Sequence, residues 1–229
     1  METTVIYYTA NTEDGGFEEK IRENILKHIG DVPLISVSQK PLPGFGKNIC
    51  VGVHDNCYAN EFRQVQIALN EVKTPYVLTA EADTLYPPEY FSFKPPKLVE
   101  HYRYTNVWVH YNLYDGWISE RKKTGVGGTP KFYFKGNSNA AQAIGRDFWL
   151  NDINKALEGK KEWFTKEDKM PPIPIVPFDK RYFWKSDNPV VTFKTGKGVR
   201  RYTDVLNKDY KESLPYWGTA KDLRKEMFT

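Results

Sequence analysis

The residues Pro75-Tyr76-Val77-Leu78-Thr79-Ala80-Glu81-Ala82-Asp83 carry the strongest pattern in the sequence. Their first part is a short apolar run, with aromatic and β-branched residues, of the kind that forms a buried strand. Two carboxylates follow, and residues two apart in an extended chain point to the same side. The pattern therefore predicts a strand over 76–80 whose exit presents Glu81 and Asp83 at one point.

The residues before this strand alternate between strand and helix patterns. Runs over 4–9 and 33–37 predict two further strands. Apolar residues at helical spacing predict a helix over 17–29, stopped by Gly30, and another over 58–72. Strand, helix, strand, helix, strand is typical of a parallel sheet covered by helices, in which ligands bind at the carboxyl ends of the strands.

The second half of the chain is less regular. Short runs predict strands over 105–110, 131–135 and 189–194, and residues 49–53 earlier in the chain predict a short strand or extended segment. A helical pattern covers Asn139–Leu150, with Ser138 or Asn139 as its N-cap, and four prolines within Met170–Pro177 predict an extended connector. We expect one α/β domain over 1–229, with a mostly parallel central sheet, helices on both faces and an irregular C-terminal part.

The composition excludes several classes of protein. With 229 residues, 40% hydrophobic, 27% charged and a mean hydropathy of −0.63, the chain has no apolar run near the roughly 18 residues that span a bilayer. The start, Met1–Thr4, carries an acid where a secretory signal would be basic. Two cysteines exclude a disulfide scaffold. We expect a cytoplasmic protein, in the host cytoplasm if the chain is viral.

Charge is unevenly distributed along the chain. Residues 1–150 hold 16 basic and 17 acidic residues (−1) and residues 151–229 hold 17 and 12 (+5), which together give the formal net charge of +4. A basic C-terminal part indicates an anionic ligand such as a phosphate, a nucleotide or a nucleic acid, although a solvated lysine-rich surface has the same composition. The cations are densest over 194–201, which suits either a loop closing over phosphates or a basic hairpin tip.

The pair Glu81 and Asp83 indicates a metal site. Mg²⁺ and similar cations are bound by one or two carboxylates and fill their remaining positions with substrate phosphate oxygens and water. An isolated E-x-D triplet is also common at the start of a solvated loop. The surrounding sequence therefore has to decide between the two interpretations.

That surrounding sequence resembles the GT-A fold glycosyltransferases, particularly the broad family 2-like group. In those enzymes a helix with Asn and Arg precedes a strand that ends in a D-x-D-type motif, followed by a Pro-containing turn. The corresponding residues here are Asn60-Glu61-Phe62-Arg63-Gln64, Pro75–Ala80, Glu81-Ala82-Asp83 and Pro87-Pro88-Glu89-Tyr90, and Val5–Thr9 with Ala10-Asn11 matches the start of the nucleotide pocket. The resemblance covers residues 4–90.

The resemblance implies a nucleoside-diphosphate sugar as donor and Mn²⁺ or Mg²⁺ as cofactor. The resemblance and the basic stretch over 194–201 together indicate the donor-binding residues Thr9, Ala10, Asn11, Gln39, Lys40, Arg63, Glu81, Lys194, Lys197 and Arg200. The metal ligands that the resemblance implies are Asp83 and Glu81. The sequence departs from the family in having E-x-D for D-x-D. It also has no histidine after His110, where many relatives place a further metal ligand.

A catalytic base is needed only if the reaction inverts the sugar configuration. Inverting relatives place an aspartate late in the chain, often in a Glu-Asp pair, which indicates Asp168 within Glu167-Asp168 and, second, Asp147. A solvated turn is the alternative for residues 166–169. We expect a nucleotide-sugar-binding half over 1–115 and an acceptor-binding half over 116–229 with a mobile basic segment.

Aromatic residues make up 15% of the chain, and many lie between Tyr86 and Trp117. They either fill a thick core or form an acceptor platform, since rings stack on sugars and on unstacked bases. The predicted function is a metal-dependent hexosyl- or pentosyltransferase. Its acceptor hydroxyl lies on DNA with hydroxymethylated bases, as for phage DNA-modifying enzymes, or on a glycan, lipid or protein.

Two alternatives to a glycosyltransferase remain open. A sugar-phosphate nucleotidyltransferase shares this sheet but usually has a Gly-rich loop with Arg and Lys after its first strand, whereas residues 10–16 here are acidic. A glycan- or nucleic-acid-binding module that keeps the sheet without chemistry is the second alternative.

Overall fold

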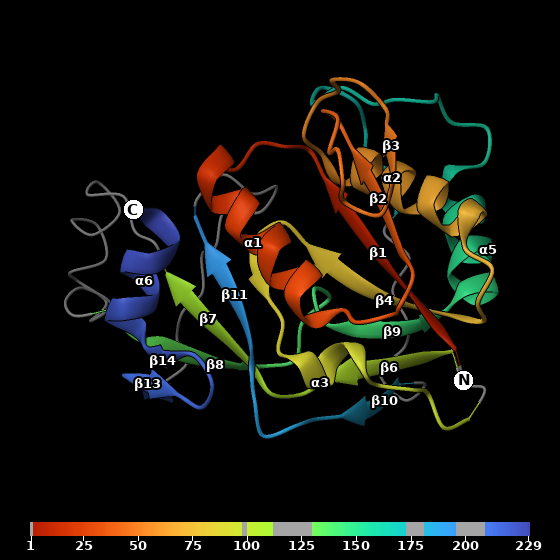
Figure 1. Ribbon diagram of the computed structural model, residues 1–229. Coiled ribbons are helices and arrows are strands. Elements are labelled where there is room, and N and C mark those ends of the chain that lie inside the picture. Colours follow the sequence, from red (N-terminus) through yellow and green to blue (C-terminus); the bar gives the residue numbers. More distant parts are fainter. Residues whose placement is uncertain (1, 98–99, 112–129, 173–180, 196–208) are drawn as a thin grey trace.

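The computed structural model describes residues 2–97, 100–111, 130–172, 181–195 and 209–229. Its larger sheet has seven strands in the order β10-β6-β9-β4-β1-β2-β3 (Figure 1). These strands are β1 (Thr3–Thr9), β2 (Leu34–Ser38), β3 (Lys47–Cys50), β4 (Tyr76–Glu81), β6 (His101–Tyr104), β9 (Gln142–Gly145) and β10 (Arg181–Trp184). The predicted residues Lys197 and Arg200, the end of the predicted connector after Pro172, and the aromatic residues between 112 and 117 lie outside the described residues.

The four strands β4, β1, β2 and β3 run parallel, and β9 runs antiparallel between β4 and β6. The strands predicted over 4–9, 33–37 and 76–80 are confirmed as β1, β2 and β4, and the α/β class with a central sheet is confirmed as well. β3 covers residues 47–50, so it begins before the predicted segment over 49–53. The parallel strands place their carboxyl ends together at one edge of the sheet.

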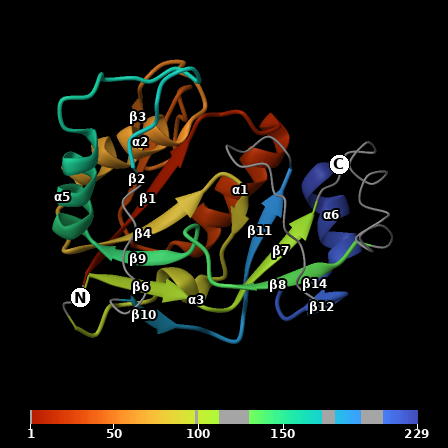
Figure 2. The same ribbon diagram turned by 180° about the vertical axis from the view of Figure 1, so that it is seen from behind.

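Helices cover both faces of this sheet. Along β1, Val5 and Tyr7 belong to the core beneath α1 (Gly15–His28), whereas Ile6 and Tyr8 belong to the core beneath α2 (Tyr58–Glu71) and α5 (Arg146–Leu157). This alternation is the period of two that an extended chain imposes on its side chains. All of β1 is buried because it lies in the middle of the sheet with helices on each side (Figure 2).

A second sheet of five strands lies beside the first, in the order β12-β8-β7-β11-β5. Its strands are β5 (Thr84–Leu85), β7 (Val107–Tyr111), β8 (Phe132–Gly136), β11 (Val190–Lys194) and β12 (Tyr210–Lys211). The remaining elements are α3 (Pro88–Phe91), the hairpin strands β13 (Ser213–Leu214) and β14 (Gly218–Thr219), and α6 (Ala220–Phe228).

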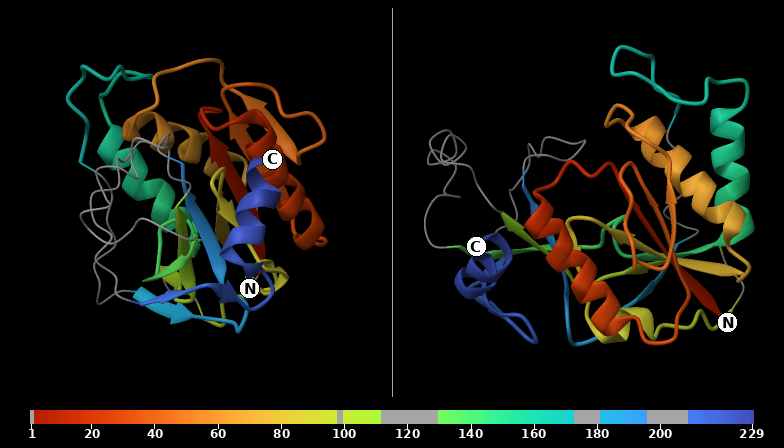
Figure 3. Two further views of the ribbon diagram at one scale, coloured as in Figure 1. Left: turned by 90° about the vertical axis from the view of Figure 1, so that its left-hand side faces the viewer. Right: turned by 45° about the horizontal axis from the view of Figure 1, so that its top comes forward.

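α6 packs beside α1 (Figure 3), where the rings of Phe17 and Phe228 stack with centroids 4.7 Å apart. The hairpin and α6 are regular elements in a part of the chain where the sequence predicted none. No helix in the described part of the chain is both long and apolar enough to cross a bilayer.

The helix predicted over Asn139–Leu150 is confirmed only for residues 146–150, and its first part is wrong. Residues 142–145 form β9, and the helix α5 begins only at Arg146. The Ser138 hydroxyl accepts from the Ala140 amide (3.3 Å), so it closes a local turn instead of capping a helix. Small buried residues in this stretch let β9 fit between β4 and β6, and this tertiary pairing overrides the helix propensity of alanine.

Two buried tyrosine hydroxyls complete the pairing of β4 with β9 beyond the point where their ladder ends, at Leu78 and Ala143. The Tyr90 hydroxyl donates to the Thr79 carbonyl (2.8 Å) and accepts from the Gln142 amide (3.0 Å). The Tyr86 hydroxyl donates to the Ala140 carbonyl (2.7 Å) and accepts from the Glu81 amide (3.0 Å). Burial raises the pKa of both phenols, so the hydroxyls stay protonated.

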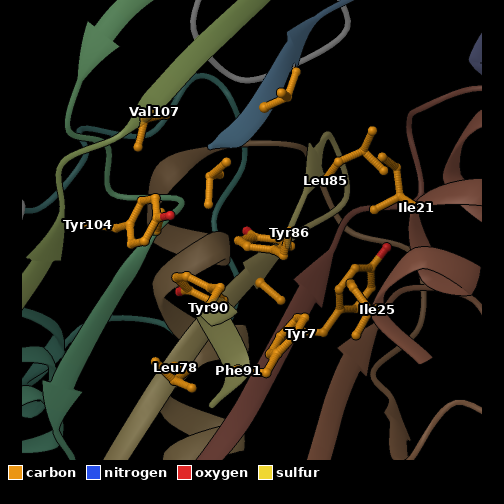
Figure 4. Close-up of a cluster of buried hydrophobic side chains, with 14 of the residues drawn as sticks. Tyr7, Ile21, Ile25, Leu78, Leu85, Tyr86, Tyr90, Phe91, Tyr104 and Val107 are labelled. Atoms are coloured by element: carbon orange, nitrogen blue, oxygen red, sulfur yellow. The ribbon is translucent and has the colours of Figure 1, made fainter. Parts of the chain in front are cut away.

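Many of the aromatic residues that follow the acidic pair thus fill the core. Tyr86, Tyr90, Phe91 and Tyr104 are each at most 2% exposed. Figure 4 shows the rings of Tyr86 and Tyr90 side by side in this core. For these four residues the structure therefore supports the core interpretation, and an acceptor platform would need other rings.

The turn between β2 and β3 depends on Gly46, which has a φ of +61°. A Cβ at this position would clash with the Leu34 carbonyl oxygen and lie 2.7 and 2.8 Å from two Leu34 side-chain carbons. Gly44 also has a positive φ (+73°), but a Cβ there would meet nothing within 4 Å. Steric crowding thus distinguishes two glycines that share the left-handed conformation.

We predict that Gly46→Ala lowers the free energy of unfolding by about 2–4 kcal/mol, because backbone strain and a clash add. Gly44→Ala is the matched control and should cost only about 1 kcal/mol from the left-handed backbone. Urea denaturation of both variants measures the difference. Equal costs would contradict the close approach of Gly46 to Leu34.

Candidate functional site

A polar cleft of about 120 Å³ lies at the carboxyl ends of β1, β2 and β4. It is lined by the ends of these strands, the loop after β1, the segment before α2 and the first turns of α2. The lining residues are Tyr8, Thr9, Ala10, Thr12, Glu13, Gln39, Asp55, Asn56, Cys57, Asn60, Glu61, Gln64, Glu81, Ala82 and Asp83. The predicted site residues Thr9, Ala10, Gln39, Glu81 and Asp83 are therefore brought together.

Asn11 joins the two loops beside the cleft. Its φ is +50°, a left-handed conformation that asparagine tolerates better than most residues. Its side-chain oxygen accepts from the Lys40 amide (2.8 Å), and its side-chain nitrogen donates to the buried carboxylate of Glu18 (3.1 Å). Neither Asn11 nor the exposed Lys40 is among the residues that line the cleft, so here both organise the backbone around it.

The strand ends are held in place by two buried glutamine side chains. Gln64 donates to the Thr9 carbonyl (2.7 Å), where β1 ends. The Gln39 side-chain oxygen accepts from the His54 amide (3.0 Å), which fixes the segment before α2. Both glutamines are at most 5% exposed. The polar wall of the cleft is therefore preorganised by hydrogen bonds within the protein.

Asn60 clamps a further loop against this wall. Its side-chain nitrogen donates to the carbonyls of Asp55 (2.7 Å) and Phe164 (2.9 Å), and its oxygen accepts from the Phe164 amide (2.9 Å). In the same loops, the rings of His54 and Trp163 stack at 3.7 Å. The clamp thus ties the segment around residue 164 to the start of α2.

Glu81 and Asp83 lie where the sequence predicts them, at the exit of β4. The Tyr8 hydroxyl donates to Glu81 Oε1 (3.1 Å), and the Thr84 hydroxyl donates to Asp83 Oδ1 (2.9 Å). Burial, and next the charge of Asp83, raise the pKa of Glu81 to about 7. Burial and the neighbouring carboxylate of Asp83 thus both disfavour the ionised form of Glu81.

Glu61 is a third carboxylate of the cleft, to which the sequence analysis gave no role. Burial raises its pKa to about 8, with further contributions from the charges of Glu81 and Asp83. The signal in the sequence is helical spacing, because Asn60, Glu61 and Gln64 share one face of α2 that is polar although it points inward. An inward polar helix face indicates a site.

Two lysines from the second sheet approach the acidic pair from its other side. Lys194 at the end of β11 lies with Nζ 3.5 Å from Asp83 Oδ2. Lys135 on β8 donates to the Ser138 hydroxyl (2.8 Å). Burial, and next the charge of Lys194, lower the pKa of Lys135 to about 8, while Glu81 and Asp83 act in the opposite direction. Lys194 was predicted, and Lys135 was missed because a single lysine in an aromatic strand has no motif.

Arg63 lies on α2 but its guanidinium points away from the cleft. It donates to the carbonyls of Lys161 (2.8 Å) and Glu162 (2.9 Å) and to the side chain of Gln66 (2.9 Å). These contacts anchor the loop after α5 to α2. The structure therefore does not bring Arg63 to the acidic pair, and its contact with a diphosphate stays a prediction.

The two predicted catalytic aspartates lie outside the cleft lining. Asp168 Oδ2 accepts from the amide (2.5 Å) and hydroxyl (2.9 Å) of Thr165 and pairs with Lys161, and these contacts, Lys161 first, lower its pKa to about 2. Asp147 is 80% exposed in the first turn of α5 and pairs with Arg146. Their catalytic roles stay predictions.

The cleft residues fit a divalent cation. In the described ranges no group of three His, Cys, Asp or Glu side chains is arranged to hold a metal ion. Glu81 and Asp83 would supply two carboxylates, as is usual for Mg²⁺ that is shared with substrate phosphates. Burial, and next the charges of neighbouring carboxylates, raise the pKa values of Glu61 and Glu81, and a bound cation would favour their ionised forms. His110 takes no part, because it is buried and its Nε2 bonds the Ala220 carbonyl (2.9 Å).

We predict that the stability gained by Glu61→Gln grows as the pH rises from about 5 to about 8. The folded chain holds the Glu61 proton to a higher pH than the unfolded chain, so ionisation in this window costs stability that glutamine does not lose. The gain at pH 8 should be on the order of 1 kcal/mol, since part of the effect is screened by solvent.

Urea denaturation in EDTA at several pH values measures this gain. Glu19→Gln, at an exposed position of α1, is the matched control and should show no pH-dependent gain. A gain for Glu61→Gln that is the same at every pH would refute the raised pKa of Glu61.

No family model matches the chain, and no curated protein matches its sequence. Solved structures that resemble it include a glycosyltransferase involved in the glycosylation of the major capsid of PBCV-1, at 10% identity. That likeness covers 84% of this chain and 93% of the other, with a TM-score of 0.44.

Two bacterial proteins also resemble the chain. The bifunctional IspDF from Campylobacter jejuni is 10% identical, with 71% of this chain and 46% of that one covered and a TM-score of 0.39. The glycosyltransferase GlyE of Streptococcus pneumoniae TIGR4 is 11% identical, with 80% and 45% covered and a TM-score of 0.39. The chain thus spans less than half the length of either protein. At these identities and TM-scores, its function has to be argued from its own cleft.

Proposed function

We propose that the chain is a glycosyltransferase of the GT-A type that moves a sugar from a nucleoside diphosphate to an acceptor hydroxyl. The observation that carries the proposal is the pair Glu81 and Asp83 at the exit of β4, in a polar cleft built from the ends of three parallel strands. Such strand ends are where open α/β sheets bind nucleotides.

The cleft offers a place for each part of the donor. The backbone and side chains at Thr9, Ala10 and Gln39 would contact the nucleoside, as the resemblance implies. The diphosphate would lie toward Asp83, where Lys194 already lies within 3.5 Å. Lys135 lies on β8, which β7 separates from β11 in the same sheet, and it would stabilise charge on the departing diphosphate.

A divalent cation, Mn²⁺ or Mg²⁺, would be held by Asp83 and Glu81 and would offset the negative charge of the leaving diphosphate. Tyr8 orients Glu81 through its hydroxyl, and Thr84 orients Asp83. Glu61 adds to the negative charge on the same side. A cation bound by these carboxylates would explain why they gather in a cleft that is proposed to bind an anionic donor.

The sugar-phosphate nucleotidyltransferase is the weaker alternative. The loop after β1 has no basic side chain between Ala10 and Gly16. Instead, Asp14 caps α1 by accepting from the amides of Gly16 (3.1 Å) and Phe17 (3.3 Å), and Glu13 accepts from the Thr195 hydroxyl (3.0 Å). This loop therefore lacks the basic side chains that a nucleotidyltransferase usually places after its first strand to bind a triphosphate.

We propose one domain over 1–229, with donor binding in 1–115 and acceptor binding in 116–229. All residues that line the cleft fall between Tyr8 and Asp83, and one hydrophobic core runs from Val5 to Met227. The net charge of +5 in residues 151–229 favours an anionic acceptor, for which DNA with hydroxymethylated bases is our first choice and a glycan the second.

We predict that nucleoside-diphosphate sugars with Mn²⁺ raise the thermal stability of the chain and are slowly hydrolysed by it. Asp83→Asn should abolish the thermal shift and lower hydrolysis at least about 100-fold, because the cation that would offset the charge of the diphosphate loses a carboxylate ligand. Asp31→Asn, at an exposed position before β2, is the matched control. If no donor stabilises the wild-type chain, with or without metal, the chain is no glycosyltransferase.

We predict that Lys135→Gln weakens the affinity for the same donors about tenfold, since a half-buried cation facing the diphosphate is lost. Lys131→Gln, four residues earlier and next to the Tyr210 ring, should leave the affinity unchanged. Calorimetric titration of both variants measures the difference. Equal donor affinities for the two variants would show that Lys135 does not contact the donor.

The acceptor is tested by incubating the chain with a radiolabelled donor and either hydroxymethylated or unmodified DNA. Incorporation into the hydroxymethylated DNA alone supports our first choice. If the labelled sugar is incorporated into a neutral glycan but into neither DNA, the acceptor is a glycan and the proposed donor is unaffected.

A further inference from the structure

A second hollow, of about 560 Å³, lies between α1 and α6. We call it the α1 groove, and its walls are α1 from Lys20 to His28, the β13–β14 hairpin and α6. In Figure 3 α6 runs beside α1, which closes the groove on one side. The loop before α1 lines the donor cleft, and 14 helical residues extend over roughly 21 Å, so the α1 groove is a separate site.

An exposed tyrosine is held in place at this groove. Tyr216, at the tip of the hairpin, is 48% exposed and has a φ of +69°, which is unusual for a residue with a bulky side chain. Its ring meets that of Trp217 edge-on, with centroids 4.8 Å apart. Backbone strain of this kind persists where the surroundings fix a residue, and it occurs preferentially at ligand-binding positions.

His28 fixes the hydroxyl end of Tyr216. Its Nε2 and the Tyr216 hydroxyl are joined by a hydrogen bond of 2.5 Å, and its Nδ1 lies 2.9 Å from the Tyr86 carbonyl. Burial lowers the pKa of His28, so the ring is neutral at physiological pH. The aromatic wall is thus tied to the core through Tyr86 and brings no charge.

The charged side chains of the groove balance one another. Lys20 and Lys27 face Glu23 and Glu226, two cations against two anions. Lys20 Nζ also donates to the Glu226 carbonyl (2.5 Å), which links α1 to α6. This balance gives no preference for an anionic ligand such as a nucleotide or for a cationic one. The features of the groove that can select a ligand are therefore its two aromatic rings and its several polar side chains.

We propose that the α1 groove is a second binding site, for a neutral carbohydrate. A sugar ring has an apolar face that packs on an aromatic ring, and hydroxyl groups around its edge that bond carboxylates, amides and amines. Tyr216 and Trp217 supply the rings, and Glu23, Lys27 and Glu226 supply the hydrogen-bonding groups. The site is distinct from the donor cleft and does not depend on the transferase proposal.

The test is titration with neutral oligosaccharides of the malto, cello, chito, manno and galacto series up to about 10 mM, a range that detects weak binding. Intrinsic tryptophan fluorescence and thermal shift report binding. We expect at least one series to bind, and Tyr216→Gly to weaken that binding at least tenfold. Glycine accepts the left-handed backbone, so this variant removes the ring while relieving strain in the hairpin.

Two further variants separate the groove from a general effect on the protein. Tyr216→Asn also tolerates a positive φ and should lose binding as Tyr216→Gly does. Tyr182→Ala removes a comparably exposed ring (41%) on β10 and should bind as the wild type. Asp83→Asn should likewise bind oligosaccharide normally, and Tyr216→Gly should keep the donor-induced thermal shift.

No binding by any series overturns the proposal, and so does binding that survives in Tyr216→Gly and Tyr216→Asn. Displacement of the oligosaccharide by a nucleotide or by DNA would show that the groove takes anions, which also overturns it. Because the donor shift is read in the same variants, failure of the carbohydrate site is distinguishable from failure of the transferase proposal.

Discussion

The burial of β4 is the constraint on which the rest of the structure depends. This strand lies between β1 and β9, and Tyr76, Val77, Leu78 and Ala80 are fully buried. Every polar backbone group along it must therefore find a partner within the protein. Where β9 diverges, the hydroxyls of Tyr86 and Tyr90 take over the hydrogen bonds that a neighbouring strand would make.

This arrangement also places the acidic pair. Glu81 is the last residue of β4, and its amide is bound by Tyr86 while its carboxylate receives the Tyr8 hydroxyl. The second sheet begins at once with β5, so that Asp83 meets Lys194 from β11. The same short stretch thus ends one sheet, starts the other and carries the carboxylates of the cleft.

The sequence predicted those parts of the fold that local periodicity determines. β1, β2 and β4 follow from short apolar runs, α1 and α2 follow from helical spacing that ends before Gly30 and Pro75, and the position of Glu81 and Asp83 follows from β4. β9 could not be predicted, because the pairing that makes Ala143 and Ile144 a strand joins segments far apart in the chain. The tyrosine bridges and Lys135 depend on the same distant contacts.

The orientation of α2 explains the outcome for its polar residues. Asn60, Glu61 and Gln64 line the cleft, whereas the guanidinium of Arg63, on the same helix, bonds the loop after α5. A resemblance assigns a role to a residue type in a segment, but the rotation of the helix decides which side chain reaches the ligand. For Asp168, too, the resemblance does not determine where the side chain lies, because a local turn with Thr165 fixes its position.

The two tyrosine bridges are reflected in the spacing of residues along the sequence. They place Tyr at the third and seventh positions after Asp83, so the stretch 81–90 has the spacing E-x-D-x-x-Y-x-x-x-Y. Phenylalanine at either tyrosine would remove one hydrogen bond from a backbone amide and one from a backbone carbonyl of this sheet. In this chain the spacing E-x-D-x-x-Y-x-x-x-Y is therefore the sequence counterpart of a sheet that divides at this strand.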